Sequence, residues 1–301
     1  MPALDFIIVG AQKCATTTLH KYLSEHPDIC MPAGKEAPFF NDTNADDKAY
    51  QRYLQQEFSH VKPGQITGKA TPQYMSSADI PARIKQLSPN TRIVAVLKDP
   101  IKRAFSQYRM ALRRGTELRT FEQAIRESLS PEKLAAGRST TAPTHANGYV
   151  SEEDYYVPWG EYGRILANYV QLFKHDQILV VFTDELEHQP QKTLDKITQF
   201  LGLQPGFTPT LMGEKFHVGG GKPRVNPALI RTVVTGPFFR GIYSLIPEVV
   251  KNTCRYWFEQ KNVVASQASP MLSDSTNEKL ASLYRKDAEL LVAMGYAPPW
   301  Q

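Results

Sequence analysis

The chain has 301 residues, of which 42% are hydrophobic and 22% charged, as is ordinary for a globular protein. Its 35 basic and 30 acidic residues leave a net charge of +5, which suits anionic ligands but does not require a nucleic-acid partner. No apolar run approaches the roughly 20 residues of a membrane-spanning helix, so we expect no membrane span.

The first predicted strand, residues 6–9, leads into a loop suited to an anion. Gly10 follows the strand, and three threonines then open a helix over residues 16–26. The first N–H groups of a helix lack partners within it, and the helix dipole favours negative charge there. Lys13 adds a full positive charge. The expected phosphate-binding residues of this anion loop are Gln12, Lys13, Cys14, Ala15, Thr16, Thr17 and Thr18.

The position of Lys13 argues against an ordinary ATP-binding P-loop. The Walker A pattern G-x-x-x-x-G-K-[ST], started at Gly10, puts Ala15 at its second glycine and Thr16 at its lysine. Lys13 therefore lies three residues before the lysine position of that pattern. Cys14 is either a reactive thiol, since helix N-termini lower thiol pKa, or a small residue that fills space.

A loop-like stretch over residues 30–46 contains a candidate general base, Glu36, close to two phenylalanines. Partial desolvation there would raise the pKa of its carboxyl group toward neutrality. Helical patterns follow over residues 46–56 and 78–88, and a short strand, Ile66–Ala70, lies between them.

A second strand–turn–helix junction begins at the apolar strand Arg92–Leu97. Lys98 follows it directly, and a helix is predicted over residues 101–114. The carboxyl ends of parallel strands form one binding edge of such a sheet. Lys98 and Ser106 are therefore either ligands of a second anion or ordinary solvated residues of a helix N-terminus.

The stretch over residues 129–158 lacks periodicity and is expected to be a lid or acceptor-site insertion, with disorder as the alternative. The other predicted elements are helices over residues 120–128, 162–174, 190–201 and 273–294, a strand over 178–182, a glycine- and lysine-rich loop over 217–227, and short packed helices over 233–250. Alternating strands and helices predict one α/β domain over residues 1–301, with a mainly parallel sheet between two helical layers.

The cysteines indicate a reducing environment. Cys14, Cys30 and Cys254 cannot all pair, and their spacing fits neither a disulfide framework nor a zinc site. We therefore expect a cytoplasmic protein.

The anion loop resembles the 5′-phosphosulfate loop of sulfotransferases that use 3′-phosphoadenosine 5′-phosphosulfate (PAPS), roughly G-x-x-K-x-G-T-T-x-L. Ala15 stands where that family prefers glycine, which is costly if the residue needs a positive φ. The family resemblance implies a P-loop-NTPase-like three-layer sandwich, PAPS as the sulfuryl donor, and a hydroxyl-bearing small-molecule or carbohydrate acceptor.

The resemblance also implies a separate pocket for the 3′-phosphate of PAPS. Lys98 and Ser106 match the Arg and Ser of the family segment R-D-P-x-x-R-x-x-S-x-Y, with lysine replacing arginine. Lysine binds phosphate as a point charge, so its contact is less directional. The loop that caps this side in the family is matched by Gly220, Gly221, Lys222 and Arg224.

Three further segments resemble the acceptor side of the family. Lys35-Glu36-Ala37-Pro38-Phe39-Phe40 matches K-E-x-x-F-F, whose glutamate is the proposed base. The stretch over residues 68–74 is like G-E-[KA]-[ST]-P-x-Y, with a lysine in place of the acidic residue. The residues implied to line the acceptor site are Lys35, Phe39, Lys69, Thr71, Tyr74, Trp159 and Tyr162, the last two with buried packing as the alternative.

The base could also be a histidine, as in another branch of the superfamily. His20, His26, His60 and His217 are candidates by residue type only, and the first two fit an ordinary helix surface and its end. The basic residues Arg103, Arg109, Arg113, Arg114 and Arg119 either attract an anionic acceptor or form a solvated helix face.

In the sulfotransferase interpretation, Lys13 neutralises charge that develops on the leaving oxygen, Glu36 deprotonates the acceptor, and no metal is expected. Two alternatives remain: a small-molecule or nucleotide kinase, and a non-catalytic nucleotide-binding protein. The position of Thr16 counts against the kinase, and the presence of Lys13 and Glu36 counts against the non-catalytic protein. The sequence leaves the oligomeric state open.

Overall fold

Five parallel strands form the central sheet of the computed structural model. The model describes residues 3–32, 34, 36, 39–114, 116–139, 155–213, 222–223, 263–264 and 271–300. The strands are β1 (Phe6–Gly10), β2 (Ile29–Cys30), β3 (Ile66–Ala70), β4 (Arg92–Leu97) and β5 (Ile178–Phe182). Their spatial order is β2-β3-β1-β4-β5, with β1 in the centre.

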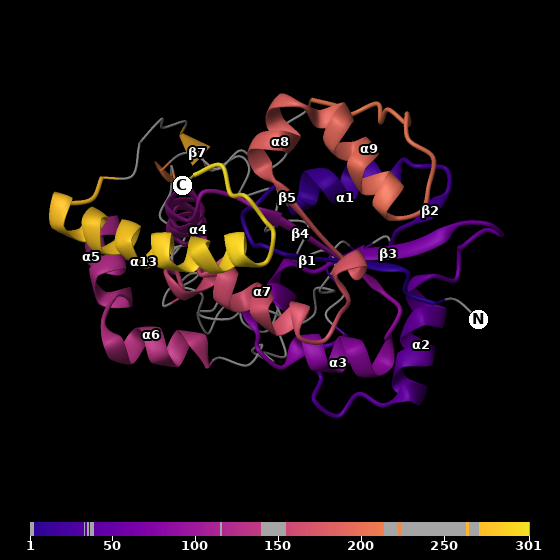
Figure 1. Cartoon of the computed structure of the whole chain (residues 1–301), viewed down its shortest axis with the longest axis horizontal. Coiled ribbons are helices and arrows are strands. Elements are labelled where there is room, and N and C mark those ends of the chain that lie inside the picture. The colour runs from indigo at the N-terminus through magenta and orange to yellow at the C-terminus, as the bar shows by residue number, and fades with distance from the viewer. Residues whose placement is uncertain are drawn as a thin grey trace, which may run out of the picture.

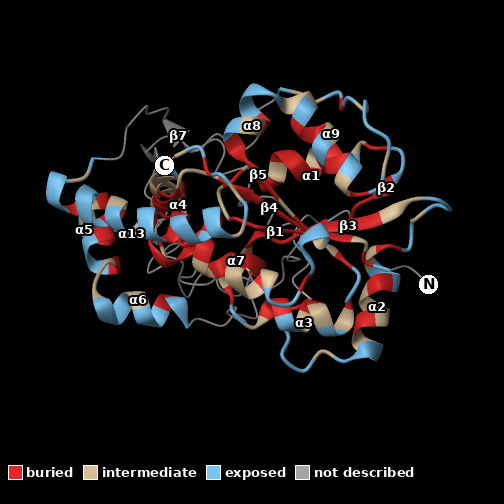
Figure 2. Ribbon diagram, in the orientation of Figure 1, coloured by how far each residue is buried: buried red, intermediate tan, exposed pale blue. Residues whose placement is uncertain are grey.

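The register places the ends of β1 and β4 side by side. Phe6 pairs with Gly68 of β3 on one side and with Arg92 of β4 on the other. All five residues of β1 are buried, as is typical of a parallel strand with both faces covered (Figure 2). Gly68 is required by this packing, because a Cβ atom there would lie 2.0 Å from the ring of Phe6.

Helices cover both faces of this sheet (Figure 1). Helices α1 (Thr16–Ser24), α8 (Thr183–His188) and α9 (Pro190–Phe200) lie on one side. Helices α3 (Ile80–Leu87) and α7 (Tyr162–Val170) lie on the other, and α2 (Asp47–Glu57) lies toward the β2 edge. The predicted three-layer α/β architecture is confirmed.

A second group of helices extends the molecule to the left of the sheet in Figure 1. It contains α4 (Pro100–Arg114), α5 (Phe121–Ser128), α6 (Pro131–Arg138) and α13 (Asp274–Ala293). These helices share a hydrophobic cluster that includes Tyr108, Phe121, Tyr156, Leu280 and Tyr284. The same polypeptide therefore has a sheet core and an adjoining helical core.

Side-chain caps fix several helix starts. Asp46 accepts a hydrogen bond from the backbone N–H of Ala49 at 2.7 Å, and Thr120 forms a capping box with Gln123. Ser130 and Ser273 cap α6 and α13 in the same way. The described residues also form short 3₁₀ turns, η1 (Pro72–Ser76), η2 (Pro158–Gly160) and η3 (His175–Gln177).

Among the described residues, the structure differs from the sequence prediction at several places. The stretch 129–158, expected to be without regular structure, contains α6 and the start of η2, and helix α8 and strand β2 were not predicted. The helix predicted over 162–174 ends at Val170. Residues 140–154 lie outside the described part of the chain, so the lid stays a prediction.

The predicted helices over 233–250 also lie outside the described residues. In the neighbouring stretches, β6 (Lys222–Pro223) pairs antiparallel with β7 (Val263–Val264). Within the described ranges, no helix combines the length and apolar character needed to cross a bilayer.

Candidate active site

The anion loop connects β1 to α1 at the carboxyl edge of the sheet. The backbone N–H of Ala11 donates to the carbonyl of Val96 at 2.8 Å, which holds the loop against β4. Cys14, Thr16 and Thr18 are buried, whereas Gln12, Lys13 and the other loop residues are half-buried. The predicted loop is therefore formed. Cys14, Thr16 and Thr18 are buried within it, whereas Lys13 is partly accessible to solvent.

The N-terminus of α1 fits an anionic ligand. Among the described residues, no side chain caps its first turn, and that turn contains no acidic residue. The other helices reported above with Asp, Ser or Thr caps satisfy their first amides internally. The N-cap residue of α1 is Ala15, whose side chain offers no acceptor, so the first amides of α1 and the hydroxyl of Thr17 suit a phosphate-like group.

Ala15 adopts the backbone conformation that the family glycine allows. Its φ is 58° and its ψ is 17°, in the left-handed region, and Lys13 has a φ of 70°. A left-handed conformation costs an L-residue roughly 1–2 kcal/mol. The chain thus keeps the loop shape despite having alanine instead of glycine.

The second junction lies beside the first. Asp99 caps α4: its carboxylate accepts the Lys102 N–H, and its carbonyl accepts the Arg103 N–H, both at 2.8 Å. Lys98 and Ser106 are half-buried, one just before α4 and the other in its second turn. Lys98 is also close enough to the Cys14 thiol to lower its pKa, so the two junctions adjoin.

Cys14 fills space rather than offering a reactive thiol. It is fully buried, and its sulfur lies 3.7 Å from the hydroxyl of Tyr162. Burial raises the pKa of the thiol, and the opposing effects of Arg103 and Lys98 do not reverse the shift.

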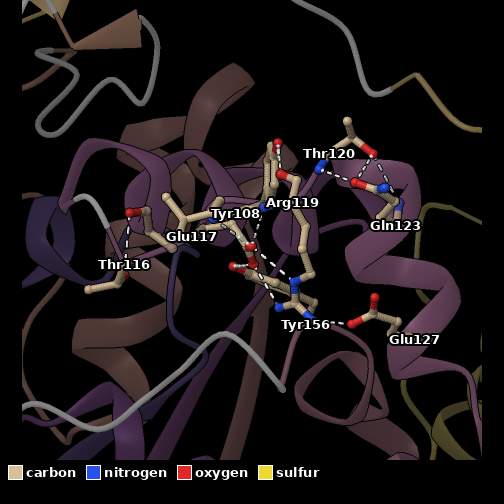
Figure 3. Close-up of polar contacts among 10 residues, drawn as sticks. Tyr108, Thr116, Glu117, Arg119, Thr120, Gln123, Glu127 and Tyr156 are labelled. Carbon is tan, nitrogen blue, oxygen red and sulfur yellow. Dashed lines mark hydrogen bonds and ion pairs between the residues drawn. The ribbon is translucent and has the colours of Figure 1, made fainter. Parts of the chain in front are cut away.

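Two of the five arginines predicted to form a basic face are held in internal contacts. Arg103 is fully buried and donates to Gln107 at 2.7 Å and to the carbonyl of Tyr156. Arg119 pairs with Glu117 at 2.8 Å and with Glu127 at 2.6 Å (Figure 3). Neither residue belongs to a solvated helix face.

Glu117 is the centre of this polar cluster. Its buried carboxylate also accepts the hydroxyl of Tyr156 at 2.9 Å (Figure 3). Burial alone would raise the pKa of Glu117, but hydrogen bonds from Arg119 and Tyr156 lower it overall. The cluster fixes the turn between α4 and α5 against residues 155–157.

Glu36 lies in an exposed loop, where its carboxylate accepts a hydrogen bond from the Gln73 amide at 3.2 Å. The partial burial expected from its aromatic neighbours is not found, because Phe40 packs inward against Tyr74 while Glu36 does not. Lys35 lies outside the described residues.

Lys69 is fully buried, in contrast to the accessible position expected for an acceptor-lining residue. Its ammonium group lies 3.1 Å from the hydroxyl of Tyr74 and 4.8 Å from the ring centroid of Tyr53. Desolvation lowers the pKa of Lys69 to about 7, with Glu57 opposing the shift. Phe39 stacks on Tyr53 at a centroid distance of 4.8 Å.

The remaining acceptor-side residues are packed inside the protein. Trp159 is buried and stacks on Tyr155 at 5.1 Å, and Thr71 is buried at the end of β3. Tyr162 is buried too, but its contact with Cys14 brings it to the anion loop. Buried packing, the alternative given for both residues, thus accounts for Trp159. Tyr162 is packed as well, but it also contacts the anion loop through Cys14.

The candidate histidines are placed as follows. His20 is buried rather than at a helix surface, whereas His26 follows the end of α1 as expected, is buried, and packs on Phe207 at 4.6 Å. His60 contacts the carbonyl of Met31 at 3.2 Å. His217, Gly220, Gly221 and Arg224 lie outside the described residues, and of Lys222 only its backbone pairing in β6 is described.

Sequence reasoning missed Tyr53, Gln73 and Asp287. Tyr53 and Gln73 contact Lys69 and Glu36, and Asp287 accepts the N–H groups of Gly163 and Arg164 at the start of α7. Tyr53 could have been noticed as an aromatic residue three positions after Tyr50 on one helix face. No local pattern marks the other two.

Residues 4–211 match the family model of the sulfotransferase domain. The chain belongs to this family. It is 29% identical over 198 residues to human heparan sulfate glucosamine 3-O-sulfotransferase 3B1, covering 66% of this chain and 46% of that protein. It is 27% identical over 265 residues to human heparan sulfate glucosamine 3-O-sulfotransferase 6, covering 79% and 70%.

Two solved structures support the fold. A sulfotransferase from Alicyclobacillus acidocaldarius matches with a TM-score of 0.65 at 20% identity, over 99% of this chain and 98% of the other. Mouse sulfotransferase SULT7A1 complexed with PAP matches with a TM-score of 0.50 at 14% identity, over 95% and 85%. The predicted P-loop-NTPase-like fold is thereby confirmed. The chain spans about half the length of its curated human relatives 3B1 and 3A1, covering 46% of the first and 44% of the second.

Proposed function

We propose that this chain transfers a sulfuryl group from PAPS to a hydroxyl group of a carbohydrate acceptor. The observation that carries the proposal is the uncapped start of α1 beside Lys13, adjoining a second cationic junction at Lys98, in a sulfotransferase-domain chain. A donor with phosphates at two ends of one nucleoside needs two such sites.

The 5′-phosphosulfate would be held by the anion loop. The first amides of α1 and the threonine hydroxyls donate hydrogen bonds, while Lys13 stabilises negative charge on the leaving phosphate oxygen. Because that charge grows during transfer, Lys13 contributes more to the transition state than to ground-state binding. The half-buried position of Lys13 fits both tasks.

The 3′-phosphate would be held by Lys98 and Ser106 at the start of α4. The loop containing Gly220, Gly221, Lys222 and Arg224 would close over the same end of the nucleotide. Asp99 satisfies two early amides of α4 itself, so this site depends more on side chains than the first one does.

Glu36 would accept the proton of the attacking hydroxyl. Its exposed position leaves the carboxylate accessible, and the Gln73 contact orients one of its oxygens. A positioned base of this kind contributes about 10²–10⁴ in rate.

A carbohydrate acceptor is supported by the names of the relatives, which are sulfotransferases of heparan sulfate glucosamine. A kinase is disfavoured because Thr16 begins α1 where the Walker pattern requires lysine.

The test is a transfer assay with PAPS and a panel of glucosamine-containing oligosaccharides, simple sugars, alcohols and phenols, with products identified by mass spectrometry. We expect sulfated oligosaccharide from the wild-type chain and almost none from Lys13→Ala. ATP consumption with Mg²⁺, and no product from PAPS on any acceptor, would contradict the proposal.

A further inference from the structure

Lys69 is an unusual residue for the interior of a sheet protein. It belongs to β3, and its ammonium group lies among three aromatic rings, 4.8 Å from the centroid of Tyr53, 5.1 Å from Tyr74 and 6.0 Å from Phe40. None of its surface is exposed. A buried charge of this kind is expensive unless it is well compensated.

The Tyr74 hydroxyl connects this lysine to the Glu36 loop. It accepts one hydrogen bond from Lys69 Nζ at 3.1 Å and another from the backbone N–H of Phe40 at 3.1 Å. The Tyr169 hydroxyl donates to the Tyr74 carbonyl at 2.9 Å and so fixes the backbone of η1. Tyr74 is therefore held from three sides.

Glu36 depends on the same turn. Phe40 follows it by four residues, and Gln73, next to Tyr74, donates to the Glu36 carboxylate. Turn η1 also contacts the anion loop, because a Cβ atom on Gly10 would lie 2.6 Å from the Cβ of Met75. Turn η1 thus lies between the proposed base and the proposed donor site.

We propose that Lys69 is a positioning residue, which holds the Glu36 loop against η1 through the hydroxyl of Tyr74. The proposal rests on the proposed function for the role of Glu36, although the loop attachment itself can be measured without any turnover.

The cost of burying Lys69 supports this role over a purely structural one. An apolar side chain of similar length would fill the same space and avoid the desolvation that shifts this lysine toward its neutral form. The ionised groups and phenols around it are Tyr53 and Glu57 on α2 and Tyr74 on η1. What the lysine adds is a hydrogen bond to the Tyr74 hydroxyl at 3.1 Å, which an apolar side chain of the same length cannot make.

Three variants and one control test the proposal. Lys69→Met keeps the length but removes the donor, Tyr74→Phe removes the hydroxyl, and the double variant removes both. Lys85→Met is the control, because Lys85 also lies over an aromatic ring, 5.0 Å from the centroid of Phe173, but contacts neither Tyr74 nor Phe40 in the described structure.

Two readouts separate positioning from folding. In the first, amide hydrogen exchange at Phe40 should accelerate at least tenfold in Lys69→Met and Tyr74→Phe, while exchange in β1 and β4 stays unchanged. In the second, kcat should fall about ten- to hundredfold, as expected for a misplaced catalytic group, with the affinity for adenosine 3′,5′-bisphosphate within twofold of wild type. The kcat of the double variant should be no lower than the kcat of the less active single variant, because both substitutions break the same connection.

Wild-type exchange at Phe40 in Lys69→Met, or wild-type kcat in that variant, would overturn the proposal. So would additive losses in the double variant, since two independent effects would then be present. If the wild-type chain transferred no sulfuryl group, the proposed function would fail, and the exchange data would still decide whether Lys69 holds the loop.

Discussion

The carboxylate of Asp287 lies 2.7 Å from the backbone nitrogen of Gly163, so α13 caps the start of α7 although 124 residues separate the two positions. Helices α7 and α13 approach each other closely at this point, because a Cβ atom on Gly163 would lie 2.2 Å from the carbonyl oxygen of Asp287. Tyr162, one residue before Gly163, contacts Cys14 of the anion loop. Helix α13 therefore supports the proposed donor site indirectly.

Replacing Asp287 by alanine should destabilise the protein by about 1–3 kcal/mol, because the N–H groups of Gly163 and Arg164 lose their acceptor. Urea unfolding measures the change. Glu289→Ala, an exposed position on the same helix, is the control and should change stability by less than about 0.5 kcal/mol. Equal effects of the two substitutions would contradict the capping role.

The same carboxyl group should give stability a characteristic pH dependence. Desolvation raises the pKa of Asp287 to about 6, above the roughly 3.9 of an unfolded chain. Between these values the folded state binds more protons than the unfolded state, so this group lowers stability as the pH rises from about 4 to 6. A plot of the urea midpoint against pH should therefore fall less steeply between about pH 4 and 6 in Asp287→Asn than in the wild-type chain. The same slope in both proteins would show that another group titrates.

Ala15→Gly should stabilise the chain by up to about 1.6 kcal/mol. Relief of a left-handed alanine gains roughly 1–2 kcal/mol, whereas the extra freedom of glycine when unfolded costs about 0.4–1 kcal/mol. Thermal and urea unfolding measure the difference. Ala70→Gly, at a buried strand position, is the opposite control and should destabilise. Destabilisation by both would indicate that Ala15 is not strained.

Lys13→Ala and Lys98→Ala should differ in kind. Lys13→Ala should lower kcat by at least about 10²–10³, because it removes transition-state stabilisation. Lys98→Ala should mainly raise the Kd of adenosine 3′,5′-bisphosphate, about ten- to hundredfold, by removing a charged contact. Steady-state kinetics and calorimetry on each variant make the comparison, and small, equal effects from both would argue against these roles.

The parts of the fold that sequence reasoning located well are those with local signals. Strands β4 and β5 have the predicted bounds, because buried parallel strands are short apolar runs between turn residues. Strand β3 also has the predicted bounds, although its sequence, ITGKA, is not an apolar run. Helix α6 was missed because it buries only Gly137 and so has no apolar face, although Ser130-Pro131 was a usable start signal.

The parts that could not be predicted depend on distant contacts. The burial of Lys69 requires aromatic residues from the Glu36 loop, α2 and η1. The internal pairing of Arg119 requires a buried glutamate two residues earlier, which sequence alone presents as one more surface charge. In both cases a charged residue type suggested an accessible position, and tertiary packing decided otherwise.

The most direct test of the account is calorimetric titration with adenosine 3′,5′-bisphosphate and with 5′-AMP, both in the presence of a metal chelator. The first nucleotide should bind at least tenfold more tightly than 5′-AMP, which lacks the 3′-phosphate, and Lys98→Ala together with Ser106→Ala should abolish that difference. Equal affinity for the two nucleotides in the wild-type chain, or binding that requires Mg²⁺, would contradict a donor site built from two adjoining strand–helix junctions.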